Sequence, residues 1–265
     1  MKRFFVLILI IMGGVCLAAE LEEKSLYSAS VPVLSQSIDE RTEAAKEGLK
    51  QVVIKLTGTS SVIDNNPDMA QEIQRAAYYL QAFHYELASL SASRHTLHLH
   101  FNAAEINTLL ARERIPIWHG KRPVILLWLT YQGSHDEDII SEDSVDELLP
   151  QLRTLADERG LPLVLPLMDT QELSYLSEFP AKEVPLASYQ TLAKRYDYDA
   201  ILVGYLNKSG KEWEGKWILL NNNTVLEWEQ NNQDVDVLIA SMLNDVSQYF
   251  FKKSKTQQLV NGVKT

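Results

Sequence analysis

The sequence predicts an α+β / α/β protein of two small domains. The first is expected to hold an antiparallel sheet with helices on one face, and the second a mixed sheet flanked by helices. Three patterns lead to this prediction. The apolar run 122–131 is bounded by turn signals and is typical of a strand buried on both faces. Before it the elements follow in the order strand, helix, helix, strand, strand, helix, and after it strands alternate with helices.

The first domain is expected over residues 20–118. It begins with an edge strand, because Pro32 cannot donate a hydrogen bond to a neighbouring strand. Ser37 followed by Glu40 is a capping-box pattern that begins a helix, and Gly58 is placed to end it. The predicted elements are strands at 26–33, 78–87 and 95–102, helices at 37–58 and 68–77, and a short helix after Asn102.

The second domain is expected over residues 119–253, with a flexible polar tail at 254–265. The boundary follows Trp118, where Gly, Pro and charged residues cluster between apolar segments. Ser144 is expected to start a helix that carries Pro150 in its first turn or is kinked by it. Besides the central run, strands are predicted at 161–167, 199–206, 212–220 and 224–229, and helices at 185–196 and 234–251.

Residues 1–19 have the pattern of a secretory signal peptide rather than of a folded element. Two basic residues precede an uncharged apolar segment and small residues follow it, so we expect cleavage after Ala18 or Ala19. Cys16 is the only cysteine, so the cleaved chain would hold no thiol and no disulfide. The residues before Cys16 lack the Leu-small-small pattern of a bacterial lipobox, which disfavours lipidation there, and an uncleaved anchor is also disfavoured.

The composition is that of an acidic globular protein. Hydrophobic residues make up 46% of the chain and charged residues 23%, which provides for a sizeable core. The formal net charge is −10, and removal of the basic signal peptide makes it more negative. Such a surface argues against nucleic acid and anionic membranes as main partners. No other apolar stretch is long enough for stable membrane insertion, so the cleaved protein is expected to be soluble.

Three histidines suggest one possible metal site. His98 and His100 share a face of the predicted strand 95–102, and His84 belongs to the strand expected beside it. Imidazoles on adjacent strands are able to ligate zinc. No cysteine is present to help, and no carboxylate has a fixed spacing to these residues. We therefore favour a polar, solvated strand face and keep zinc binding as an alternative.

Asp169 is the one candidate for an enzymatic site. It follows a predicted strand of the second domain, and open α/β sheets place ligand sites at the carboxyl ends of their strands, which here would include the Tyr131 end of the central run. With Glu172 three residues on, Asp169 also fits a helix N-cap, and we favour that role. The acidic loop 135–138 lacks the glycine and the closing glutamate of a calcium loop, so it is interpreted as solvated.

Three tryptophans lie in the predicted hairpin of the second domain. Trp213 and Trp217 share a strand face, and Trp228 follows on the next strand. Aromatic side chains so placed are able to stack on a sugar or a peptide. Such residues more often cover a core or anchor a partner, and this is the interpretation we favour.

Short motifs along the chain are shared with a known family: Val31-Pro32-Val33, Arg41, 48–58, Pro67, 81–85, 116–118, Arg122-Pro123, Trp128, Pro166 with Asp169, Tyr196 with Asp199-Ala200, Gly204, Trp213 and Trp217. In these residues the chain resembles a family of exported proteobacterial proteins known as domain of unknown function 2066. That resemblance places the protein in a Gram-negative bacterium and brings no catalytic residues with it. The second half is also similar, more distantly, to α/β modules of periplasmic assembly and secretion-accessory proteins.

The sequence contains no nucleophile elbow, phosphate-binding loop or dinucleotide fingerprint. We therefore assign no catalytic, cofactor-binding or metal residues and expect no cofactor. The expected function is that of a soluble periplasmic, non-catalytic binding or envelope-assembly accessory module, with another envelope protein as partner. Two alternatives stay open: a hydrolase with its site at the strand ends of the second domain, and a metal-binding protein that uses the histidine face.

Overall fold

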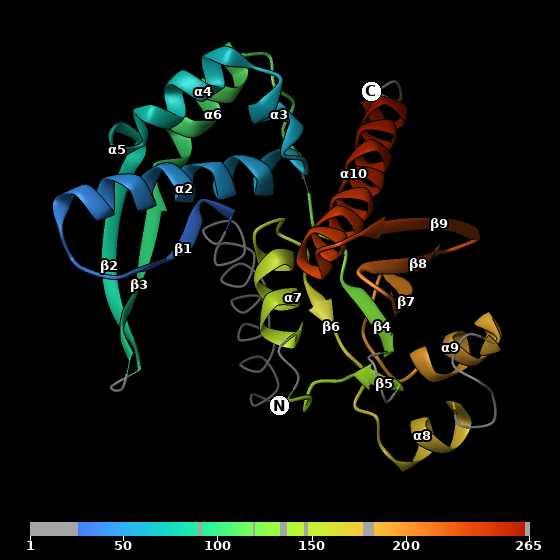
Figure 1. The fold of residues 1–265 in the computed structure, drawn as a ribbon. Coiled ribbons are helices and arrows are strands. Elements are labelled where there is room, and N and C mark those ends of the chain that lie inside the picture. Colours follow the sequence, from blue (N-terminus) through green and yellow to red (C-terminus); the bar gives the residue numbers. More distant parts are fainter. Residues whose placement is uncertain are drawn as a thin grey trace, which may run out of the picture. The chain divides into compact units, whose positions relative to one another are not determined.

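The computed structural model describes residues 26–89, 92–118, 120–132, 137–145, 148–176 and 183–262. The chain divides into two compact units, residues 1–117 and 118–265 (Figure 1). The predicted signal peptide, residues 1–19, lies outside the described residues. Within the described ranges, no helix combines the length and the apolar character that crossing a membrane requires.

The first unit is a three-stranded antiparallel sheet in the order β1-β3-β2, with helices packed on one face, as predicted (Figure 1). Alternate residues of the central strand, Leu97, Leu99 and Phe101, are buried in a core that also contains Leu49 and Val52 of the first long helix. The elements are β1 (Ser28–Val33), α2 (Ile38–Thr57), α3 (Ser61–Asp64), α4 (Pro67–Gln74), α5 (Ala76–Tyr79), β2 (Leu80–Ser89), β3 (Ala92–Phe101) and α6 (Ala103–Arg112).

The predicted caps of α2 are confirmed, with one difference in the capping box. The Ser37 hydroxyl accepts a hydrogen bond from the Glu40 N–H, and Gly58 closes the helix with φ 71°. The Glu40 carboxylate does not return to Ser37. It accepts hydrogen bonds from the Ser35 hydroxyl and the Leu34 N–H, which lower the pKa of Glu40. The loop before α2 is therefore attached to its first turn.

The second unit is a mixed six-stranded sheet in the order β5-β4-β7-β8-β9, with β6 also paired to β4. β4 is parallel to β6 and β7, and every other pairing is antiparallel. The prediction of a mixed sheet flanked by helices is confirmed. The elements are β4 (Ile125–Gln132), β5 (Glu137–Ile140), α7 (Leu148–Asp157), β6 (Leu163–Val164), α8 (Thr170–Leu176), α9 (Leu186–Ala193), β7 (Ala200–Ser209), β8 (Glu212–Asn221), β9 (Thr224–Asn232) and α10 (Val235–Gly262).

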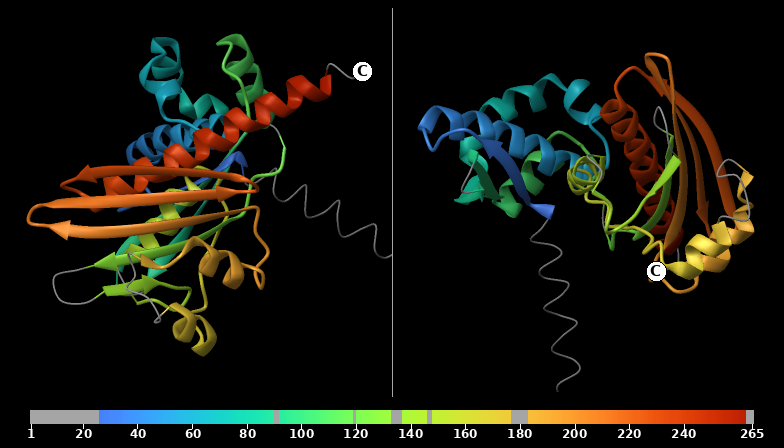
Figure 2. Two further views of the ribbon diagram at one scale, coloured as in Figure 1. Left: turned by 90° about the vertical axis from the view of Figure 1, so that its right-hand side faces the viewer. Right: turned by 60° about the horizontal axis from the view of Figure 1, so that its bottom comes forward.

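Strand β4 is buried on both faces, as its unbroken apolar sequence predicts. Ile125, Leu127 and Leu129 belong to a core formed with α7 and α10, and α10 lies along this face of the sheet (Figure 2). Leu126 and Trp128 point into a second core formed with α8 and α9. β4 therefore contributes side chains to two cores, one under each layer of helices. This explains why its first five residues are all apolar.

Three local predictions for the second unit are wrong. Ser144 does not start a helix: its hydroxyl accepts the Ser141 N–H in a turn, and α7 begins at Leu148 with Pro150 in its first turn. The strand expected at 161–167 is only the two-residue β6, because Pro162 and Pro166 cannot donate to a neighbouring strand. The acidic run interpreted as a solvated loop ends in strand β5, which the sequence did not predict. Helix α10 extends into the predicted polar tail, as far as Gly262.

A close approach between β7 and β8 depends on a glycine. Gly204 lies directly opposite Trp217, whose ring is 1% exposed. A methyl group at Gly204 would lie 2.6 Å from the Trp217 ring and 2.8 Å from Leu129. Real side chains do not approach so closely, so the indole and the strand must shift if this glycine gains a side chain.

Replacing Gly204 with alanine is therefore expected to lower the free energy of unfolding by about 1–3 kcal/mol, because it overpacks the core. Gly210→Ala is the control: φ there is +65° and the space is open, so only backbone strain is added. Denaturant unfolding of both variants, with and without Trp217→Phe, separates the two causes. The smaller ring should reduce the cost of Gly204→Ala and leave that of Gly210→Ala unchanged; equal, additive effects would contradict the packing argument.

Candidate functional site

The three predicted histidines are neighbours in the first sheet but do not surround a common point. His84 and His98 lie opposite each other on β2 and β3, with their rings stacked at 4.5 Å. Both ring nitrogens of His98 are engaged, one with Ser30 at 3.0 Å and one with Glu86 at 2.8 Å. Over the part of the chain that the structure describes, no group of three His, Cys, Asp or Glu side chains is placed to hold a metal ion. The geometry gives the zinc alternative no support.

Asp169 has a structural role that counts against the hydrolase alternative. Its carboxylate accepts the Glu172 N–H at 3.1 Å, as an N-cap of α8 does, and pairs with Arg195 at 2.7 Å. The hydrogen bond from Arg195, followed by that from the Glu172 backbone, lowers the pKa of Asp169. The carboxylate therefore holds its charge and its partners in place, and we do not assign it to catalysis.

The tryptophans of the hairpin belong to the core rather than to a stacking surface. Trp213 and Trp217 are buried among residues of α10, and Trp228 is partly buried against the same cluster.

The end of the acidic loop differs from the prediction of a solvated loop. Glu137 begins β5, and the Asp138 carboxylate accepts the N–H of Ile139. His135 and Asp136 of that predicted loop lie outside the described residues.

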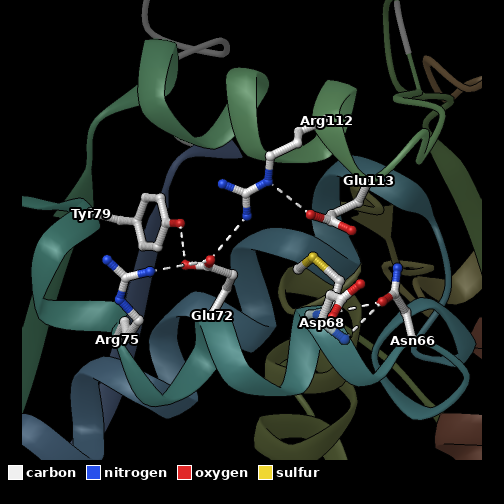
Figure 3. Close-up of polar contacts among 8 residues, drawn as sticks. Asn66, Asp68, Glu72, Arg75, Tyr79, Arg112 and Glu113 are labelled. Carbon is white, nitrogen blue, oxygen red and sulfur yellow. Dashed lines mark hydrogen bonds and ion pairs between the residues drawn. The ribbon is translucent and has the colours of Figure 1, made fainter.

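Glu72 on α4 is the centre of a polar network in the first unit, and the sequence did not single it out (Figure 3). Its carboxylate accepts hydrogen bonds from the Tyr79 hydroxyl at 2.6 Å, from Arg112 at 2.9 Å and from Arg75 at 3.3 Å. These donors lie on α5, on α6 and at the end of α4, so one carboxylate joins three helices. Arg112 also donates to Glu113 at 2.8 Å.

The ionisation of this network fits structure rather than acid–base chemistry. Hydrogen bonds from Tyr79 and Arg112 lower the pKa of Glu72. Burial, together with the hydrogen bond to Glu72, raises the pKa of Tyr79 to about 12. A general acid or base works best with a pKa near the working pH. Both groups are moved away from neutral pH, so the network is a fixed set of charges that positions helices.

The feature of the first unit that points to function is an exposed group of apolar side chains around the start of α2. We name Leu34, Ile38, Phe83 and Leu87 the apolar strip; their exposed fractions are 70%, 70%, 45% and 47%. Leu34 is attached to the first turn of α2 through Glu40, and the Arg41 guanidinium lies 4.7 Å from the centre of the Phe83 ring. These contacts bring the loop, the helix and strand β2 to one surface.

The strip also adjoins a free sheet edge. β2 ends the strand order β1-β3-β2, so one side of its backbone has no partner strand among the described residues. The side chains of Phe83 and Leu87 lie on the face that packs against helices, because Phe83 is opposite the buried Leu99. The sequence predicted a strand here, at 78–87. It gave no sign that the helices leave part of the face uncovered, because that depends on how far α2 extends across the sheet.

Comparison with known proteins corrects the family resemblance. Residues 20–119 match the family model described as Domain of unknown function (DUF8605), which is a different family from domain of unknown function 2066. The prediction of the latter is wrong: the short motifs that suggested it are spread over the chain, and none is diagnostic. The match covers less than half of the chain and includes the whole apolar strip. A search of curated proteins finds no significant match.

Similarities to solved structures are remote. The C-terminal domain of LpoB from Salmonella enterica is 14% identical with a TM-score of 0.28, over 49% of this chain and 93% of that one. TolB from Acinetobacter baumannii is 11% identical with a TM-score of 0.28, over 50% and 28%. Lipoprotein GNA1162 from Neisseria meningitidis is 14% identical with a TM-score of 0.29, over 47% and 96%. At these TM-scores the similarities carry no argument about this chain.

The Glu72 network predicts a pH-dependent contribution to stability. Because the pKa of Glu72 is lower in the folded state, its stabilisation is complete above the unfolded pKa of about 4.3 and is lost as the pH falls through the folded value. Glu72→Gln is expected to cost about 1–3 kcal/mol at pH 7, since hydrogen bonds to a charged group are lost.

Urea unfolding of wild type and Glu72→Gln between pH 7 and pH 3 measures this difference, which should shrink below about pH 4.3. Glu43→Gln is the control, because Glu43 makes only an exposed pair with Lys46 and should change little. A cost for Glu72→Gln that stays constant over this pH range would contradict the assigned role.

Proposed function

We propose that the protein is an exported, non-catalytic accessory of the bacterial envelope, which acts by binding another envelope protein through the apolar strip of its first unit. The observation that carries this proposal is the exposure of four large apolar side chains on one surface, two of them 70% exposed. Groups of exposed apolar side chains mark interaction sites, whereas single exposed residues are ordinary.

The surroundings of the strip favour a protein partner over a small ligand. The side chains come from a loop, a helix start and an edge strand, so they form an extended surface. The open side of β2 offers backbone N–H and C=O groups next to this surface, and proteins bind extended segments at such edges. Arg41, stacked on Phe83, supplies a cation beside the apolar area, and arginine is enriched at interfaces.

The polar candidates for catalysis support the same proposal. Asp169 and Glu72 are held by cationic partners and hydrogen-bond donors that keep them ionised, and His98 is held between Ser30 and Glu86. Each is an ordered part of the scaffold. The tryptophans that might have stacked on a ligand fill the core of the second unit.

Loss of the apolar strip should abolish partner binding while the fold is retained. Leu34→Ser combined with Ile38→Ser removes apolar side chains that are each 70% exposed, so little stability should be lost. Cross-linking in cells, followed by purification from the periplasmic fraction, should recover a defined partner with wild type and not with this variant. The control is Val225→Ser with Val237→Ser, two valines of the second unit that are each 49% exposed.

Equal recovery of the partner by the strip variant and the control variant would refute this proposal, provided that the two show the same melting temperature. Recovery that is lost in both variants would place the interaction elsewhere on the chain and would also count against the strip.

Export has its own test. Mass spectrometry of the protein isolated from the periplasmic fraction is expected to find a mature N-terminus at Ala19 or Glu20, because the small residues after the apolar segment form the cleavage site. Val15→Arg, which places a charge at the end of that segment, should retain the uncleaved chain. Full-length protein in the cytoplasm of cells that express the wild type would contradict the proposed location.

A further inference from the structure

The second unit contains a cavity at the amino ends of β4 and β7. Its volume is about 210 Å³, and its wall is formed by the segment that leads into β4, by Asp199 just before β7, and by the middle of α10. This is the opposite end of the parallel strands from Tyr131, where open α/β sheets place their usual sites. The cavity is therefore distinct from the site that the fold class predicts.

Cations dominate the wall of this cavity. Lys121, Arg122 and Lys253 line it together with a single carboxylate, that of Asp199. The Asp199 carboxylate is already in use: it accepts the Val124 N–H at 2.8 Å and lies 3.7 Å from the Lys121 ammonium. The protein as a whole has a net charge of −10. A concave, positive region on an acidic protein concentrates the field that attracts an anion.

Arg122 is held in a fixed orientation. The residue is 2% exposed, and its guanidinium lies 3.9 Å from the centre of the Trp118 ring. Trp118 in turn is buried in the core of the second unit, edge to face with Phe251. A guanidinium stacked on an aromatic ring keeps its planar set of donors pre-organised, so little conformational entropy is lost when those donors bind an oxyanion.

Lys253 is held in place at the same end of the sheet as Arg122. Its ammonium donates to the side-chain oxygen of Asn221, and the Asn221 amide donates to the Asp199 carbonyl at 2.9 Å. This chain of hydrogen bonds joins α10, the end of β8 and the start of β7. Lys253 is thereby attached to the scaffold close to Asp199. Its ammonium has three N–H donors, so donors remain for a ligand beside the one that Asn221 accepts.

We propose that this cavity binds the oxyanion group of a small molecule, a carboxylate or a phosphate, with Arg122, Lys121 and Lys253 as its donors. Phe250 and Trp118 give the site an apolar wall beside these cations. A water molecule occupies about 30 Å³ of liquid, so the volume holds an anionic group together with a short organic body. The proposal is independent of the apolar strip, which belongs to the other unit.

Isothermal titration of the purified exported protein tests the site, with inorganic phosphate and glutarate as separate probes at constant ionic strength set by chloride. Saturable binding of at least one probe is expected. Lys253→Gln and Lys121→Gln should each weaken it roughly tenfold or more, because each removes a charged donor. Lys216→Gln is the control: Lys216 is exposed, pairs with Glu229 and lies on β8. It should bind as wild type does.

The relative affinity for phosphate and glutarate identifies the group that the site prefers. Arg122→Lys, which keeps the charge and loses the planar donors, should also weaken binding if it folds. If Arg122→Lys does not fold, the Lys253→Gln variant still tests the site. The proposal is overturned if neither probe binds saturably, or if Lys121→Gln and Lys253→Gln bind as tightly as Lys216→Gln.

Discussion

The pairing of β4 with β7 is the constraint on which the second unit depends. The two strands are parallel and in register from Ile125 with Ala200 to Gln132 with Asn207. Parallel strands need a covered sheet, and the alternating side chains of β4 fill one core under α7 and α10 and another under α8 and α9. On the far side of β7 the core closes only because Gly204 leaves room for the Trp217 ring. The amino ends of the same two strands also bring Asp199 and Arg122 to one cavity.

The sequence indicated the elements whose cause is local. The caps of α2, the apolar run of β4 and the hairpin turn at Asn222, where φ is positive, each follow from a few adjacent residues. Features set by distant residues were missed. β5 is only four residues long, and its identity as a strand depends on its pairing with β4. The ion pair between Glu72 and Arg112 joins residues of separate helices, and no periodic pattern in the sequence predicts it. The basic cavity likewise gathers residues from three segments of the chain.

Both units use the same kind of polar anchor. In the first, buried Glu72 accepts from Tyr79 and Arg112; in the second, fully buried Glu172 accepts from the Tyr196 hydroxyl and the Met168 N–H. In both cases burial and the adjacent carboxylate raise the pKa of the tyrosine to about 12. Ionisable groups that would suggest catalysis from sequence are thus ordered parts of the scaffold. Among the described residues, the apolar strip and the basic cavity are two features suited to binding.

The first unit is proposed to bind a partner protein with the surface formed by the start of α2 and strand β2. Hydrogen–deuterium exchange of the protein, alone and in the complex recovered by cross-linking, tests this most directly, because an edge strand that gains a partner protects its free N–H groups. Exchange in β2 and in the first turn of α2 is expected to be slower within the complex. Unchanged exchange in these segments, with protection confined to the second unit, would contradict it.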